Sequence, residues 1–188
     1  MLSKKYTKDY RLEPSMNARG RLTDETIYCG AYYDFRAAPA QRKKSAAVLL
    51  VQTLLAVATM SVPLFSNGDY ARKFYLFLPL ALQLVPCYLL ILALVRLRTY
   101  RPPLTRKQSD LLAGRAQSGA LLLLLFGAAG AVASTVYYFL ESPRGLDALA
   151  CALSIVRLAD GIWAFSTRRA FEMVALDPPS KSEEGASS

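Results

Sequence analysis

Three long stretches without a charged residue constrain the fold of this chain more than any other feature. They cover residues 45–65, 74–95 and 116–140, and are 21, 22 and 25 residues long. An α-helix needs about 20 apolar residues to cross a hydrocarbon core of about 30 Å. A helix in a soluble core is rarely this long and this free of charge, because one face usually meets water. The stretches therefore predict three transmembrane helices.

A fourth stretch, residues 148–167, is apolar but contains Arg157 and Asp160. Each charge costs about 2.5–3.5 kcal/mol at the centre of a membrane helix. The two residues are three positions apart, so both side chains can lie on one face. A helix lying flat on a membrane usually carries several basic residues on its polar face, and this one carries a single arginine. We therefore favour a fourth spanning helix whose polar stripe faces the bundle.

The basic residues lie on one side of these predicted spans. Residues 1–44 hold ten Lys and Arg, residues 96–115 hold six and residues 168–188 hold three, whereas the two short segments on the other side hold three together. Lys and Arg accumulate on the cytoplasmic side of membrane proteins. Both termini and the middle loop are therefore expected in the cytoplasm, and the short outer segments predict an up-and-down arrangement.

Residues 9–35 favour β-structure, because Thr, Ile, Tyr and Phe are frequent there and suit strands. Residues 17–20 are a turn signal, and Gly30 allows a bulge or a second turn. A unit of two or three short strands is marginal in water and must dock. We favour docking on the protein's own cytoplasmic face; the alternative is a partner protein held by aromatic anchors. Those anchors would be Tyr28, Tyr32, Tyr33 and Phe35.

The predicted fold class is an all-α membrane protein, a four-transmembrane-helix up-down bundle with a small cytoplasmic N-terminal β-hairpin or meander. Three parts are expected along the chain. They are a cytoplasmic segment with short strands at 1–43, a membrane domain at 44–167, and a largely disordered cytoplasmic tail at 168–188.

Five polar residues are predicted to form a layer near the middle of the membrane. At about 1.5 Å of rise per residue, they lie about 14–21 Å from the outer ends of their spans. In one interpretation they form a polar site or ion pathway. In the other, which we favour, Arg157 pairs with Asp160 and donates to a glutamine, so that the layer fixes helix register. The set is Gln52, Gln83, Tyr88, Arg157 and Asp160.

Small residues in the third and fourth spans indicate close helix packing. Pairs of small residues four apart let two backbones approach each other. Packing within one chain is the ordinary interpretation, and homodimerisation through the same face is the alternative. The pairs are Gly127 and Ala131, Gly130 and Ser134, and Ala148 and Ala152. Pro79 and Pro86 in the second span predict a bend there.

No catalytic or metal-ligating pattern is present. The chain has no histidine, and Cys29, Cys87 and Cys151 lack metal-site spacing. The net charge of +9 comes from basic residues beside apolar runs and not from a nucleic-acid module. We expect no cofactor and no nucleic-acid partner. The expected partners are the lipid bilayer and either another membrane protein or a second copy of the chain.

These features favour a non-catalytic accessory or assembly component of a membrane complex. The alternative is a small oligomeric transporter or channel that uses the polar layer around Arg157 and Asp160. An enzyme is not expected, because the acidic residues near the membrane are scattered over both faces. The expected location is the plasma membrane, in a multi-pass topology. The absence of an N-x-S/T sequon is compatible with a bacterial host.

Overall fold

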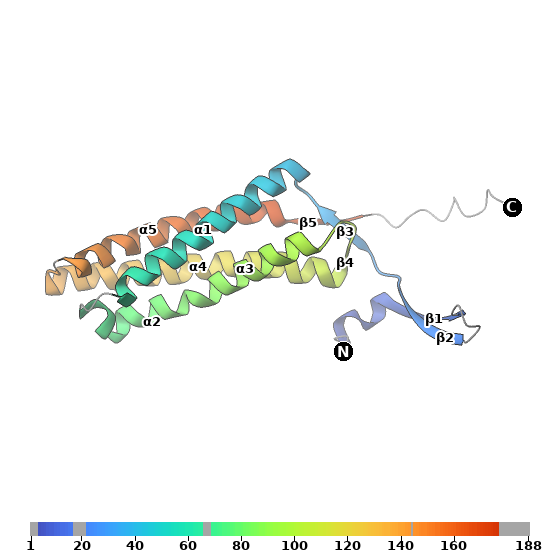
Figure 1. Cartoon of the computed structure of the whole chain (residues 1–188), viewed down its shortest axis with the longest axis horizontal. Coiled ribbons are helices and arrows are strands. Elements are labelled where there is room, and N and C mark those ends of the chain that lie inside the picture. Colours follow the sequence, from blue (N-terminus) through green and yellow to red (C-terminus); the bar gives the residue numbers. More distant parts are fainter. Residues whose placement is uncertain (1–3, 17–21, 66–68, 144, 177–188) are drawn as a thin grey trace.

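The structure is a computed structural model that describes residues 4–16, 22–65, 69–143 and 145–176. It is mostly helical, and four of its helices are long and apolar enough to cross a membrane (Figure 1). The fourth of these contains Arg157 and Asp160, and it is long and apolar enough to cross a membrane despite these two charges. The four helical stretches are Pro39–Pro63, Phe74–Thr99, Arg106–Glu141 and Leu146–Phe171.

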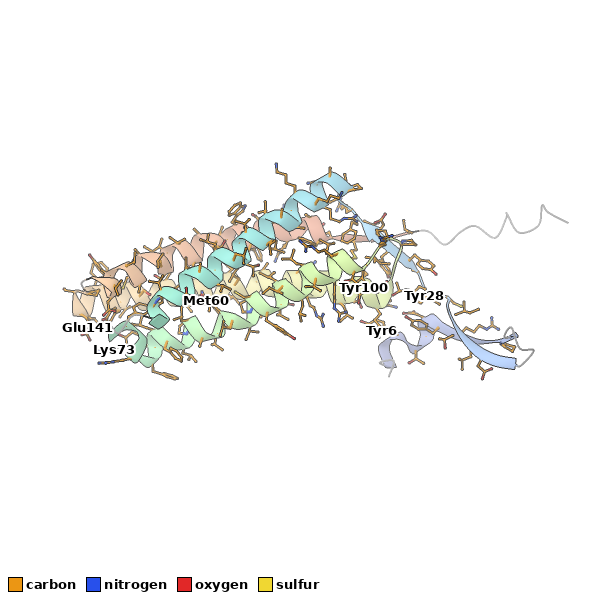
Figure 2. The ribbon with its side chains drawn as sticks, viewed as in Figure 1. Tyr6, Tyr28, Met60, Lys73, Tyr100 and Glu141 are labelled. Atoms are coloured by element: carbon orange, nitrogen blue, oxygen red, sulfur yellow. The ribbon has the colours of Figure 1, made fainter. Side chains whose placement is uncertain are left out.

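The four long helical stretches run along the bundle in alternating directions (Figure 1). Around the bundle, α1 packs against α3 and α5, and α4 packs against α2, α3 and α5. We call the end that carries the β-strands the sheet end, and the opposite end, near Lys73 and Glu141, the loop end (Figure 2). The helices are α1 (Pro39–Phe65), α2 (Phe74–Leu82), α3 (Leu84–Thr99), α4 (Arg106–Glu141) and α5 (Leu146–Thr167), with short 3-10 helices η1 (Lys4–Asp9), η2 (Asp69–Arg72) and η3 (Arg168–Phe171).

The helices extend past the predicted spans at the sheet end. Helix α1 starts at Pro39, a residue whose fixed φ suits the first helical turn. Helix α4 starts with a capping box, in which Thr105 and Gln108 each accept a hydrogen bond from the other's backbone N–H. The added turns are rich in Lys, Arg and Gln, which favour helix and are compatible with an aqueous boundary. Helix α4 therefore reaches 36 residues.

The second predicted span is divided into α2 and α3 at Gln83. Pro79 lies inside α2, and Pro86 lies in the first turn of α3. Proline has no N–H and clashes with the preceding turn, so regular helix hydrogen bonding is interrupted on both sides. The backbone N–H of Gln83 is shared between the carbonyl oxygens of Pro79 and Leu80, both at 3.2 Å.

The N-terminal strands divide between two sheets. Strands β1 (Tyr10–Met16) and β2 (Leu22–Tyr28) form an antiparallel hairpin; its predicted turn at 17–20 lies outside the described residues. Strand β3 (Tyr32–Phe35) instead lies between β4 (Leu104–Thr105) and β5 (Met173–Ala175). The expectation of a hairpin is therefore confirmed, and a three-stranded meander is not formed.

Residues 168–175, at the start of the tail that was predicted to be largely disordered, contain regular structure. Residues 168–171 form η3, and residues 173–175 form β5. The physical reason is burial: Phe171 is fully enclosed in the core, and Met173 pairs with Phe35 in the sheet and packs against the same core. The part of the prediction that concerns residues 177–188 lies outside the described residues.

Buried apolar residues form two clusters inside the bundle. The larger joins α1, α3, α4 and α5, and the smaller, around Tyr70 and Tyr137, lies at the loop end. Large apolar side chains such as Leu54, Val132 and Ile155 face outward and are more than half exposed. An apolar outer surface of this kind suits contact with lipid and not with water.

Candidate functional site

The bundle turns four of the five predicted polar residues inward. Gln52, Gln83, Arg157 and Asp160 are each at most 3% exposed. They come from α1, from the break between α2 and α3, and from α5. Counted from the loop end of each helix at about 1.5 Å per residue, they lie within about 14–21 Å of that end. The structure therefore has a buried polar band across three sides of the bundle.

Tyr88 does not belong to this band. Its side chain is 62% exposed and faces away from the bundle, whereas its neighbour Cys87 is buried. Successive residues of a helix point about 100° apart, so one position decides whether a side chain faces inward or outward. Depth along the helix was predicted from the sequence, but the direction of the Tyr88 side chain was not.

Arg157 is held by groups toward the loop end. Its Nη1 donates to the backbone carbonyl oxygen of Thr59 at 3.3 Å, and its Nη2 donates to the hydroxyl of Tyr70 at 3.4 Å. The Tyr70 hydroxyl is also hydrogen-bonded to Ser134 Oγ at 2.7 Å. The Tyr70 ring packs edge to face on Tyr137, with ring centres 5.9 Å apart. This network joins α5, α1, η2 and α4.

Asp160 lies outside that network. Neither carboxyl oxygen has a hydrogen-bond partner among the described residues, which include Arg157. The predicted Arg157–Asp160 pair is therefore not formed. The reason is competition: the long arginine side chain reaches a carbonyl and a hydroxyl nearer the loop end, and both are buried groups that need a donor or partner.

The two glutamines share this lack of partners. Both amide atoms of Gln52, and Oε1 of Gln83, are buried without a hydrogen bond to any described residue. Cys87 of α3 is also buried. Buried polar groups without partners are rare in folded proteins and each needs an explanation. A bound water or cation would supply one, since these groups offer both donors and acceptors.

Small residues bring α4 and α5 into contact at the height of this band. A Cβ atom added to Gly127 would lie 3.1 Å from the carbonyl oxygen of Arg157, and one added to Gly161 would lie 2.8 Å from the Cα atom of Leu124. Gly130 instead faces Pro79 of α2. Gly161 was not among the predicted packing residues, although its position four residues after Arg157 placed it on the same helix face.

The other predicted packing residues behave differently along the interface. Ala131 and Ser134 of α4 are buried. Ala148 is half-buried, and Ala152 is exposed. Both alanines line a groove of about 280 Å³ between α4 and α5, near the loop end. The predicted match of Ala148 and Ala152 to the face of α4 is therefore not a tight contact.

Tyr28 fastens the hairpin to the start of α4. Its hydroxyl accepts a hydrogen bond from the backbone N–H of Arg106 at 2.9 Å and donates one to the carbonyl oxygen of Ala31 at 2.7 Å. Partial burial raises the pKa of Tyr28 above its ordinary value of 10.0. Its ring packs edge to face on Tyr10 and Tyr32.

The remaining aromatic residues of the predicted docking set are used within the sheet end. Tyr33 pairs with Leu104 on one side and with Ala175 on the other. Phe35 packs against the larger core cluster, and the guanidinium of Arg42 lies 4.4 Å from its ring centre. Docking of this segment on the protein's own sheet end is therefore present. Tyr32 keeps an exposed surface.

The hairpin itself extends away from the bundle (Figure 1). Its base is held by the Arg106–Asp9 ion pair at 3.8 Å and by the Tyr6 hydroxyl, which donates to Asp110 at 3.1 Å. Figure 2 shows Tyr6 and Tyr28 near this junction. Farther along the strands, Leu12 is 65% exposed and Ile27 is 40% exposed.

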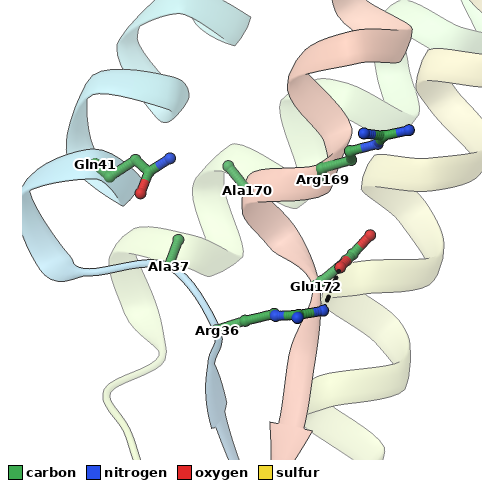
Figure 3. A pocket seen from close by; sticks show the side chains of 6 residues that line it. All are labelled: Arg36, Ala37, Gln41, Arg169, Ala170 and Glu172. Carbon is green, nitrogen blue, oxygen red and sulfur yellow. Dashed lines mark ion pairs between the residues drawn. The ribbon is translucent and has the colours of Figure 1, made fainter.

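A cleft of about 540 Å³ opens between the start of α1 and η3 (Figure 3). Arg36 and Glu172 meet across it at 3.6 Å, and the backbone N–H of Arg36 donates to the carbonyl oxygen of Glu172 at 3.0 Å. Both side chains are exposed, so the ion pair adds little stability. Nothing in the sequence pointed to this cleft. Its backbone contact extends the β3–β5 pairing and links the segment before α1 to the segment after η3.

No group of three or more Cys, Asp or Glu side chains in the described part of the chain could hold a metal ion. Cys29 is exposed, Cys87 and Cys151 are buried, and all three are free thiols.

Comparison with protein-family models, with curated proteins and with solved structures finds no match to this chain.

Proposed function

We propose that the chain is a multi-pass plasma-membrane protein with its sheet end in the cytoplasm, and that it is a non-catalytic component of a membrane-protein complex. The partner is a cytoplasmic segment of another membrane protein, and the β1–β2 hairpin is the surface that binds it. The observation that carries this proposal is the hairpin that extends from the sheet end (Figure 1), on which Leu12 and Ile27 are exposed apolar residues.

A hairpin in this position lacks what normally stabilises one. Two isolated strands are marginal in water and need a further strand or a packing surface. Leu12 lies opposite Thr26, and Ile27 lies opposite Arg11, so the two exposed apolar residues are on opposite faces of the ribbon. In the described residues, β1 and β2 pair only with each other, which leaves two free edges. A partner strand added to an edge would contact both faces.

The charge distribution supports the proposed orientation. Residues 1–44, 96–115 and 168–188 hold 19 of the 23 Lys and Arg residues, and residues 66–73 and 141–147 hold three. At the loop end, Lys73 is paired with Glu141 at 2.9 Å. Basic segments stay on the cytoplasmic side during insertion. Reporter domains fused before Met1 and after Ser188 should therefore be found on the same, cytoplasmic side of the membrane.

The partner proposal is tested by purification in mild detergent from the native host, followed by mass spectrometry. We expect a membrane protein to co-purify in a fixed ratio with the wild-type chain. Leu12→Lys and Ile27→Lys should each lower its recovery by about tenfold, the effect of about 1.4 kcal/mol of binding energy. Val174→Lys is the matched control, because Val174 is an exposed strand residue outside the hairpin. Equal recovery with hairpin and control variants would contradict the proposal.

A small oligomeric transporter or channel is the second candidate. Asp160 and Gln52, whose side chains are buried and have no hydrogen-bond partner in the described part of the chain, favour it, because intramembrane ionisable residues commonly lie on ion pathways. Purified protein in liposomes should then conduct a cation or protons, and Asp160→Asn should abolish the flux while insertion is retained. Absence of flux with the wild-type protein would exclude this candidate.

A further inference from the structure

A groove runs along the bundle surface between α1 and α3, at the sheet end. It encloses about 500 Å³, within the range of about 300–1,000 Å³ that is usual for sites of small molecules. Two small residues of α1, Ala46 and Ala47, make the hollow. The described lining consists of Arg42, Lys43, Ala46, Ala47, Leu50, Ile91, Leu94, Val95, Leu97 and Arg98.

The lining changes from charged to apolar along the groove. On α1, Arg42 and Lys43 are followed one turn later by the two alanines and a further turn later by Leu50. On α3, Arg98 is preceded by Val95 and then by Ile91 at the same spacing. From the basic mouth to Leu50 is about 12 Å at 1.5 Å per residue, which is most of the half-thickness of a bilayer core of about 30 Å.

The positive charge at the mouth is not balanced by the protein. None of the residues that the structure describes along the groove is acidic. Among the described residues, no ion pair involves Arg42, Lys43 or Arg98. Arg42 is held in place by its contact with the Phe35 ring, 4.4 Å away. The mouth of the groove therefore presents three cations beside an apolar surface, an arrangement that suits an anionic ligand with an apolar part.

We propose that this groove binds one anionic phospholipid. The phosphate lies among Arg42, Lys43 and Arg98, and an acyl chain lies between Ala47 and Leu50 on one side and Ile91 and Val95 on the other. Arginine binds phosphate oxygens with paired, charge-assisted hydrogen bonds. Basic residues near a membrane also attract anionic lipids of the cytoplasmic leaflet. This inference rests on the proposed function in one respect, the cytoplasmic position of the sheet end, and it requires no partner protein.

Native mass spectrometry of the full-length protein tests this binding. The protein is released from micelles that contain equal amounts of phosphatidylglycerol, which is anionic, and phosphatidylcholine, which is zwitterionic. We expect retention of one phosphatidylglycerol in preference to phosphatidylcholine. Lys43→Gln together with Arg98→Gln should reduce that retention by about tenfold or more, because each cation near the headgroup contributes to the attraction.

The matched control is Lys44→Gln with Arg101→Gln. It removes the same two charges from exposed neighbouring positions that do not line the groove. The control should retain phosphatidylglycerol as the wild type does. Equal retention of both lipids by the wild type, or equal loss in the groove variant and the control, would overturn the proposal.

Ala47→Phe provides an independent test, because it fills the apolar part of the groove and leaves every charge in place. It should also abolish retention of phosphatidylglycerol. Unchanged retention would show that charge attraction alone holds the lipid, and would overturn the groove as its site. Because the measurement is made on protein in micelles, a wrong membrane orientation or a missing partner protein would not produce any of these failures.

Discussion

Arg157 of α5 donates a hydrogen bond to the backbone carbonyl oxygen of Thr59 in α1, across 3.3 Å of the bundle interior. In a regular helix the N–H four residues later would bind that carbonyl, but the residue there is Pro63, which has no N–H. The arginine therefore supplies the donor that the proline removes. A charged side chain inside an apolar bundle is explained here by a backbone defect in a neighbouring helix.

Replacing Arg157 should be less harmful once that defect is repaired. Arg157→Met is expected to lower the free energy of unfolding by about 1–3 kcal/mol, because two buried acceptors lose a donor. In a Pro63→Ala background the loss should be smaller by about 0.6 kcal/mol, the average measured for hydrogen bonds between membrane helices, and by at most about 1.7 kcal/mol. Unfolding in mixed detergent micelles measures all four variants. Additive effects would show that Arg157 does not serve this carbonyl; Pro79→Ala is the control background and should give additivity.

Two glycine-to-alanine substitutions should differ in their effect on the stability of the bundle. A Cβ atom at Gly161 would lie 2.8 Å from the backbone of Leu124, which cannot move without separating α4 from α5. Gly161→Ala should therefore destabilise the bundle by about 1–3 kcal/mol. A Cβ atom at Gly114 meets nothing within 4 Å, so Gly114→Ala should be neutral or stabilising by up to about 1 kcal/mol. Thermal unfolding in detergent measures both, and equal effects would contradict the close α4–α5 contact.

Substitutions of two neighbouring polar residues of α1 should change the free energy of unfolding in opposite directions. Gln52 is buried with no partner for either amide atom among the described residues, whereas Thr53 donates to the carbonyl oxygen of Leu49 at 2.8 Å. Gln52→Met should raise the free energy of unfolding by about 1–3 kcal/mol, because it removes unsatisfied groups. Thr53→Val should lower it by about 1 kcal/mol. If Gln52→Met instead destabilises the protein, the amide has a bound water or ion as partner, which would strengthen the transporter candidate.

Tyr28 should control how firmly the hairpin is held. Tyr28→Phe removes the hydrogen bonds to the Arg106 N–H and to the Ala31 carbonyl, so amide hydrogen exchange in β2 should speed up by about tenfold, for a loss of about 1.4 kcal/mol. Tyr32→Phe keeps the ring and is the control; it should leave the exchange unchanged. A rate in Tyr28→Phe equal to that in the control would contradict this role.

The same contact predicts a pH dependence. The pKa of Tyr28 is higher in the folded chain than its ordinary value of 10.0, so the folded state holds the proton more tightly than the unfolded state. The contribution of Tyr28 to stability is then complete below pH 10 and is lost as the pH rises through the raised pKa. Measured at the same pH, the ratio of the hairpin exchange rates of Tyr28→Phe and the wild type should fall toward one in this range, and a ratio that does not change with pH would contradict the assignment.

The sequence predicted features that depend on composition along a single segment. The absence of charge from residues 45–65, 74–95 and 116–140 was sufficient to locate three long helices, and the strand-favouring residues within 9–35 were sufficient to predict the hairpin of β1 and β2. The inward direction of Gln52, Gln83, Arg157 and Asp160 followed from the cost of exposing them to lipid.

Features that depend on distant contacts were predicted wrongly or were missed. Asp160 was the obvious partner for Arg157 because it is three residues away, but the groups that bind the arginine lie 98 and 87 positions away. Depth alone could not give the outward direction of Tyr88, which depends on the rotation of α3. The three-residue strand Met173–Ala175 carries no recognisable signal, because its pairing with β3 depends on where α5 ends.

The position of β3 between β4 and β5 also sets the order in which the protein can be completed. Tyr33 has its two neighbours at Leu104 and Ala175, so β3, the first of the three strands to be made, must wait for residues that follow it by about 140 positions. The second neighbour becomes available only after α1 to α5 have been synthesised. Closure of this small sheet therefore requires that α5 has been made and that its C-terminal end lies at the sheet end. A nascent chain that stops before Met173 would leave one edge of β3 open.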